Sequence, residues 1–206
     1  MKQAATRQLY EYWDELRGER ASPERGEIDP AAIRGILADT FILEVDETRG
    51  YPFRLSGTRF NALFIEDLKG CSFEHLWAER DRGEILSILA SVCDDVVPIV
   101  AGVEAAPLNR SPIELELLLL PVRHLGKTHA RILGCMAPAR LESWIGLVPV
   151  HSLSLRALRI LPDLRRTAPF APPSFSRPWV TGGAVADHAG RSVQRRGHLF
   201  VHQNDN

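Results

Sequence analysis

The clearest pattern in the chain is an alternation of apolar and other residues that begins near residue 40. In segment 40–45 every second residue is a large apolar one, and this period of two predicts a β-strand. Turn-forming residues follow at 46–50, and segment 51–57 then repeats the alternation. The two segments therefore predict an antiparallel hairpin.

After residue 57 the spacing of apolar residues changes to three or four, which predicts helices rather than strands. Short helices are expected at 58–64 and 73–77, and a long one at 81–95. The period of two returns in three further segments, at 96–105, 113–122 and 130–137. The last part of segment 113–122 is apolar at consecutive positions, which is typical of a strand buried on both faces.

The N-terminal region predicts an amphipathic helix over residues 5–17. Leu9, Trp13 and Leu16 share one stripe of this helix, and charged residues occupy the rest of its surface. A short helix is expected at 30–37, where Pro30 follows a capping Asp. The apolar stripe of the leading helix needs a partner, which is either the outer face of the sheet or the same helix of a second copy.

The order of two strands, short helices and the break Lys69-Gly70-Cys71-Ser72-Phe73 resembles the first half of a PAS domain. The phrases YEYWDELRG, ADTFILEVD, YPFRLSGTRF and LKGCSFEHLW are similar to small stand-alone PAS proteins of alphaproteobacteria. The resemblance covers roughly residues 5–162. It implies an α+β PAS fold with a five-stranded antiparallel sheet, short helices on one face and the first strand beside the fifth. It also implies a homodimer that involves the leading helix.

The chain divides into four expected parts. They are N-terminal flanking helices (1–37), the PAS domain (38–138), an apolar extension (139–162) and a disordered tail (163–206). The extension is too apolar for a free linker and is expected to pack on the domain or on a partner chain. Pro, Arg, Ser and Gly dominate the tail, which favours disorder.

Composition excludes several classes of function. The chain has 25 basic and 26 acidic residues, so its net charge gives no reason to expect nucleic-acid binding. Three scattered cysteines without a C-x-x-C motif indicate reduced thiols, and with them a cytoplasmic protein. No apolar segment has the length of a membrane span or a signal-peptide core. We found no catalytic motif and expect no enzyme.

Cys71 is the most suggestive reactive residue, because flavin-binding light sensors of the PAS superfamily carry a Cys two residues before a Phe at this place. Here Gly70 stands where those domains have Asn, and their flavin-binding Arg and Gln are missing. Cys71 and His75 are four residues apart, but no third or fourth metal ligand lies nearby in the sequence. We expect no metal and no cofactor, and a haem- or flavin-dependent sensor is the alternative.

The resemblance implies a small apolar cavity between the sheet and the helices. The expected cavity residues are Phe41, Leu43, Phe53, Leu55, Phe64, Trp77 and Leu89. The other interpretation is that these side chains simply fill the core. The expected function is sensory signalling through protein–protein interaction, with or without a small ligand in the cavity. The output would come from a histidine kinase or regulator bound in trans.

Overall fold

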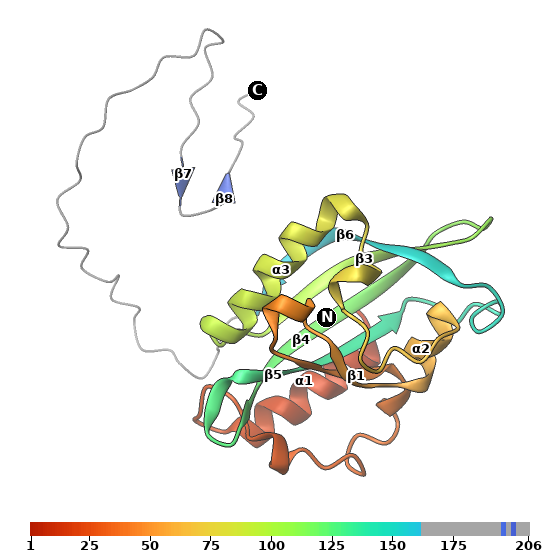
Figure 1. Cartoon of the computed structure of the whole chain (residues 1–206). Helices are drawn as coiled ribbons and strands as arrows, with labels where there is room; N and C mark the ends of the chain where they lie inside the picture. The colour runs from red at the N-terminus through yellow and green to blue at the C-terminus, as the bar shows by residue number, and fades with distance from the viewer. Residues whose placement is uncertain (162–194, 197–198, 201–206) are drawn as a thin grey trace, which may run out of the picture. The chain divides into compact units, whose positions relative to one another are not determined.

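The computed structural model describes residues 1–161, 195–196 and 199–200 (Figure 1). The chain forms two units, residues 1–167 and 168–206. The first contains helices α1 (Ala4–Arg17), α2 (Thr58–Phe64) and α3 (Glu79–Asp94), and strands β1 (Thr40–Glu44), β2 (Phe53–Ser56), β3 (Ile99–Pro107), β4 (Ile113–His124), β5 (Lys127–Pro138) and β6 (Val150–Ile160). Short 3-10 helices are η1 (Arg25–Glu27), η2 (Leu37–Asp39), η3 (Glu47–Arg49) and η4 (Glu74–Leu76). In the second unit, β7 (Arg195–Arg196) pairs with β8 (Leu199–Phe200).

The first unit is built on one six-stranded sheet in the order β2-β1-β5-β4-β3-β6, with every neighbouring pair antiparallel. The first and fifth strands were expected to be neighbours, and the pairing of β1 with β5 confirms this. The sheet has one strand more than the five expected, because residues 150–160 pair with β3 of the same chain. The predicted disordered tail (163–206) lies outside the described residues, apart from the pair β7–β8.

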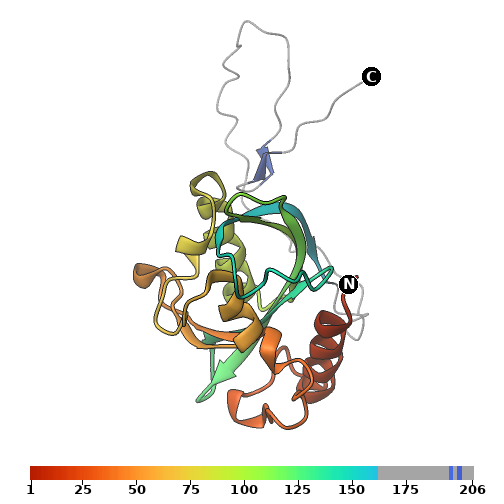
Figure 2. The same ribbon diagram turned by 90° about the vertical axis from the view of Figure 1, so that its right-hand side faces the viewer.

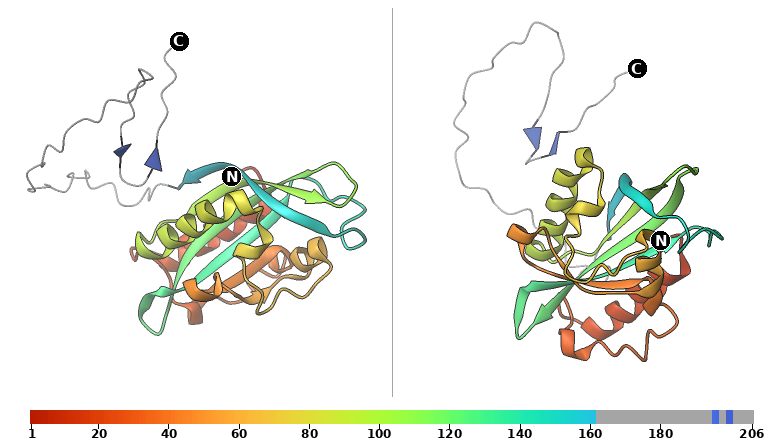
Figure 3. Two further views of the ribbon diagram at one scale, coloured as in Figure 1. Left: turned by 45° about the horizontal axis from the view of Figure 1, so that its top comes forward. Right: turned by 45° about the vertical axis from the view of Figure 1, so that its right-hand side comes forward.

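The sheet is covered on both faces. Figure 2 shows α1 and α3 on opposite sides of it, and Figure 3 shows α3 lying along one face. We call the face toward α2 and α3 the inner face and the face toward α1 the outer face. Along β4, Leu117 and Leu119 join the inner core, whereas Leu118 and Leu120 join the outer one. These four leucines are at most 1% exposed, so the expected two-sided burial of this strand is confirmed.

Helix α1 packs against the sheet of its own chain. Leu9 and Trp13 are 0% and 1% exposed and belong to the outer core, and Leu16 is partly buried against it. The Trp13 Nε1–H group donates to the Pro121 carbonyl of β4 over 2.9 Å. The apolar stripe of α1 was expected to pack on the sheet or on a second copy, and in the structure it packs on the sheet. Leu9 and Trp13 are therefore not available to a second copy.

Two of the short predicted helices have a different form. Residues 30–36 form turns followed by η2, and residues 73–77 contain only the single turn η4. Segments this short make too few i→i+4 hydrogen bonds to offset the cost of helix nucleation. Of the apolar residues expected to point inward, Ile33 and Ile36 are buried (2% and 5% exposed), whereas Leu37 is 36% exposed. None of the helices in the described part of the chain has the length and apolarity needed to cross a membrane.

Candidate functional site

The inner face carries a cluster of aromatic rings, which we call the aromatic cluster (Phe41, Phe53, Phe60, Phe73 and Trp77). Phe41 lies at its centre, with ring centroids 5.6 Å from Phe53, 5.2 Å from Phe60 and 5.5 Å from Phe73. Trp77 extends the cluster at 5.8 Å from Phe73. All five side chains are at most 2% exposed. Contacts at these distances are typical of favourable aromatic packing.

A glycine in β5 makes room for the central ring. Gly134 is the cross-strand partner of Phe41, and a Cβ atom built on it would collide with the Phe41 ring. Because glycine has no side chain, the ring lies directly over the β5 backbone. This close approach brings Phe41 down onto the sheet and leaves room for Phe60 and Phe73 beside it.

Most of the expected cavity residues do face the inner core. Phe41, Leu43, Phe53, Trp77 and Leu89 are buried there. The structure places Phe64 at the margin, partly buried and in edge contact with Phe60 at 5.7 Å. The sequence reasoning missed Phe60 and Phe73, both 0% exposed. The signal available for Phe60 was its helical spacing to Leu63, which is also buried.

Leu55 was expected beside Phe53 on the inner face and does not lie there. The pairing of β1 with β2 shifts register between Ile42 and Leu43, so Leu43 pairs with Phe53 whereas Ile42 pairs with Leu55. This β-bulge adds a residue, Arg54, and reverses the alternation. Leu55 therefore lies on the outer face, 49% exposed, where it lines an apolar hollow of about 230 Å³ beside residues 28–37.

One polar atom of the aromatic cluster lacks a hydrogen-bond partner. The Nε1–H group of Trp77 is buried and finds no acceptor among the described residues. Leaving such a donor unpaired in an apolar core costs about 1–3 kcal/mol. An acceptor atom of a small guest would satisfy it.

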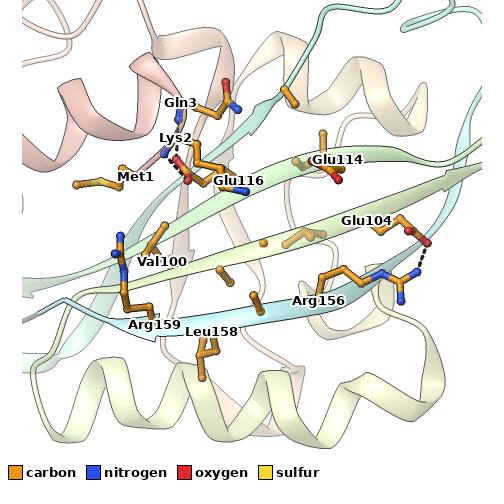
Figure 4. A pocket seen from close by; sticks show the side chains of 16 residues that line it. Met1, Lys2, Gln3, Val100, Glu104, Glu114, Glu116, Arg156, Leu158 and Arg159 are labelled. Atoms are coloured by element: carbon orange, nitrogen blue, oxygen red, sulfur yellow. Dashed lines mark hydrogen bonds and ion pairs between the residues drawn. The ribbon is translucent and has the colours of Figure 1, made fainter.

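A hollow larger than the one beside Leu55 lies on the outer face, beside the N-terminus of α1 (Figure 4). It measures about 590 Å³, and its lining comes from β3, β4, β6 and residues 1–3. We call it the outer hollow. Small residues lie on neighbouring strands in its lining, where Gly102 pairs with Ala157. Arg156, paired with Glu104, and Arg159 lie along β6.

Glu116 connects the outer hollow to α1. Its carboxylate, 8% exposed, accepts hydrogen bonds from the backbone N–H groups of Lys2 (2.7 Å) and Gln3 (3.0 Å) and from the Thr6 hydroxyl. These residues begin a helix whose first N–H groups have no intrahelical acceptor. Burial raises the pKa of Glu116, but the hydrogen bonds from Thr6, Gln3 and Lys2 lower it more, so the net pKa lies below its usual value. The ionised carboxylate thus holds the start of α1 on the sheet.

Comparison with known families identifies this arrangement. Residues 1–137 match the model of a PAS domain. The chain belongs to the PAS-domain family. A similar solved structure is an RNA-binding light-oxygen-voltage receptor, with 19% sequence identity and a TM-score of 0.41. The match covers 56% of this chain and 35% of the receptor, so the chain corresponds to about a third of the receptor's length. No curated protein matches the chain.

The PAS fold places Cys71 and His75 outside the aromatic cluster. The Cys71 sulfur is partly buried and lies 3.9 Å from a carboxylate oxygen of Glu66. Burial and the negative charge of Glu66 raise the thiol pKa above its usual value, which keeps the sulfur protonated and weakly nucleophilic. His75 is exposed on η4. Among the described residues, no group of three or more His, Cys, Asp or Glu side chains is arranged to hold a metal ion.

Proposed function

We propose that this PAS protein signals by protein–protein interaction, has no catalytic step of its own, and delivers its output through a kinase or regulator bound in trans. One contrast supports the proposal. The inner face of the sheet, where a cofactor would need space, is packed with five aromatic side chains. The outer hollow, in contrast, is open and large enough to receive side chains of another protein.

The outer hollow suits a signalling contact because it shares residues with the start of α1. Lys2 and Gln3 line the hollow and are also bonded to Glu116. A partner that fills the hollow must therefore contact the segment that positions α1. Docking of the partner and the packing of α1 are then coupled, and a change in one shifts the population of the other.

The aromatic cluster is the place where a small ligand would act on this equilibrium. The buried, unpaired Trp77 Nε1–H group favours a compact guest that carries a hydrogen-bond acceptor. Such a guest would separate Trp77 from neighbouring rings and so alter the inner core. A flavin or haem is far larger and would displace several of the five rings, each of which contributes about 3–5 kcal/mol to packing. We therefore place the cofactor-dependent sensor second.

A first experiment separates these alternatives. Protein purified gently from its own host would be examined by native mass spectrometry and by absorbance between about 350 and 500 nm. We expect no absorbance in this range, and either bare chains or a small added mass that is lost on denaturation. A visible chromophore that binds at one equivalent per chain would contradict the proposal and establish the cofactor sensor.

A second experiment tests the outer hollow. Gly102→Arg puts a long side chain on the outer face, and Gly83→Arg is the matched control because a Cβ atom at Gly83 meets open space on α3. Proteins captured by the wild type would be compared quantitatively with those captured by each variant. We expect Gly102→Arg to lose a kinase or regulator that Gly83→Arg retains, while both keep the wild-type circular dichroism. Equal capture by all three proteins would argue against this surface.

A further inference from the structure

The sheet of this PAS domain has two edge strands, β2 and β6, and main-chain contacts cover part of each. Along β2, the Phe53 N–H group donates to the Cys71 carbonyl (2.9 Å), and the Phe53 carbonyl accepts from the Gly70 N–H group (2.8 Å). Segment 70–72 therefore covers the outward main-chain groups of Phe53. A neighbouring molecule does not find a free strand edge there.

The first half of β6, at the other edge, is closed as well. The Leu153 carbonyl accepts from the Ala78 N–H group over 2.8 Å, and the Leu155 N–H group donates to Asp81 Oδ2 over 3.1 Å. These bonds tie the strand to the segment that leads into α3. They end at Leu155.

The second half of β6, residues 156–160, is different. The Leu161 N–H group donates to the Pro98 carbonyl, so residue 161 turns its main chain toward the neighbouring strand β3. Because main-chain groups alternate in direction along a strand, those of Leu158 and Ile160 point to the open edge. Among the described residues nothing pairs with them there, and their side chains are 44% and 56% exposed. An exposed strand edge with unpaired main-chain groups and two apolar side chains can pair with a strand of another molecule.

In the second half of β6, large apolar and charged side chains lie on opposite faces of the sheet. Leu158 pairs with Ala101 of the inner core, and Arg159 pairs with Val100 of the outer core. Figure 4 shows Leu158 and Arg159 on opposite sides of β6. An added strand would thus meet apolar side chains on the inner face and Arg159 on the outer face.

We propose that a second copy of the chain occupies this edge, with β6 antiparallel to β6 and the two-fold axis at Leu158. The outward main-chain groups allow two registers within 156–160, centred on Leu158 or on Arg159. The register centred on Arg159 places two guanidinium groups directly opposite each other, which is unfavourable. The register centred on Leu158 places Leu158 against Leu158, and the small Ala157 against the long Arg159.

This self-complementarity is what selects a second copy as the occupant. The half-strand supplies the apolar contact at the axis, the space for each arginine, and the main-chain donors and acceptors for both sides. Pairing of β6 with β6 also gives a closed two-fold dimer, because each copy uses the same edge and leaves no second β6 edge to extend a filament. With about five residues per strand the contact is small, so we expect a concentration-dependent dimer.

The proposed register can be tested by measuring the association constant of the full chain by sedimentation equilibrium. Leu158→Glu and Leu158→Lys each place like charges at the axis, and we expect either variant alone to lose at least tenfold in the association constant. Mixed in equal amounts, the two variants carry opposite charges at the axis, and the dimer should return. Leu147→Glu is the control, since Leu147 is 77% exposed and lies outside β6.

Several outcomes would overturn the proposal. They are a wild-type chain that stays monomeric at all concentrations, a dimer that persists in Leu158→Glu, and a mixture that does not re-associate. If the variants lose their circular dichroism, hydrogen exchange on the wild type decides instead. The Leu158 and Ile160 amides should gain protection as the protein concentration rises. Protection that is independent of concentration would mean that another part of the same chain covers the edge.

Discussion

At the residue scale, the inner core depends on the pair of Phe41 and Gly134. The ring occupies the volume where any other residue at 134 would place its Cβ atom. Both residues lie in adjacent strands inside the sheet, so neither backbone is free to move away. The absence of a Cβ atom at Gly134 thus permits the arrangement of the whole aromatic cluster.

We predict that Gly134→Ala destabilises the protein by about 3 kcal/mol, because the added methyl forces Phe41 out of its place in a close-packed core. The midpoint of urea unfolding measures the effect. Gly102→Ala is the matched control in the same sheet. A Cβ atom there meets Ala157 only at 3.7 Å, so its stability should stay within about 1 kcal/mol of the wild type. Equal midpoints for the two variants would contradict the prediction.

The alternation of apolar residues in the sequence predicted most side chains of the inner face correctly, but it was wrong for Leu55. Alternation alone placed Phe41, Leu43 and Phe53 correctly, because β1 pairs with β5 without interruption and Phe53 is the β2 partner of Leu43. It misplaced Leu55, because a β-bulge depends on how two strands meet and leaves no mark in either strand's own sequence. Phe73 was missed for a related reason, since η4 has no extended period.

At the element scale, hydrogen bonds attach α1 to β4 at two places. Glu116 accepts from its first residues and Pro121 from Trp13. Gln3, at the N-cap position, makes no side-chain capping bond, so the sheet supplies the acceptor that the helix sequence lacks. The amphipathic pattern predicted the helix itself, but an acceptor 113 residues further along the chain is beyond any local pattern.

We predict that Glu116→Gln costs about 2 kcal/mol at neutral pH, because it removes a charged acceptor shared by three donors. The folded pKa of Glu116 is lowered, so its contribution is fully present above the unfolded pKa of about 4.3 and is lost as the pH falls through the lower folded value. Denaturant unfolding at several pH values should therefore show the difference between variant and wild type shrinking toward pH 3.

Glu114→Gln provides the comparison for this measurement. Glu114 lies two residues earlier in β4 and is exposed. Its substitution should change stability by less than about 0.5 kcal/mol at every pH. A pH-independent loss in Glu116→Gln would mean that the side chain acts through its shape and not through its charge.

At the scale of the whole molecule, one sheet separates two cores that depend on each other. Strand β4 contributes to both, and α1 is the main helical cover of the outer one. The sequence allowed α1 either an intramolecular or an intermolecular partner, since an apolar stripe does not specify what covers it. The choice follows from β4, whose outer leucines require a cover.

We predict that removal of residues 1–18 abolishes cooperative unfolding. The truncation takes away Leu9 and Trp13 and uncovers the outer face of β4 and β5, at a cost above roughly 5 kcal/mol, which is close to the whole stability of a small domain. Thermal unfolding and binding of a hydrophobic dye would report it. Glu15→Lys changes only the exposed side of α1 and should unfold like the wild type. A truncated chain that melts cooperatively would show that the helix is dispensable.

The position of β6 also sets the order in which the chain can fold during synthesis. Strand β3 pairs with β6 from Ile99–Ile160 to Pro107–Val150, which separates partners by 61 to 43 residues. Residues 1–137, which the PAS-family model matches, emerge from the ribosome before β6 does. Until then the edge of β3 is bare and the N–H group of Ala78 lacks its Leu153 acceptor. A nascent chain therefore presents an incomplete sheet for several seconds at ordinary rates of translation, an interval in which chaperone binding or mispairing at β3 competes with folding.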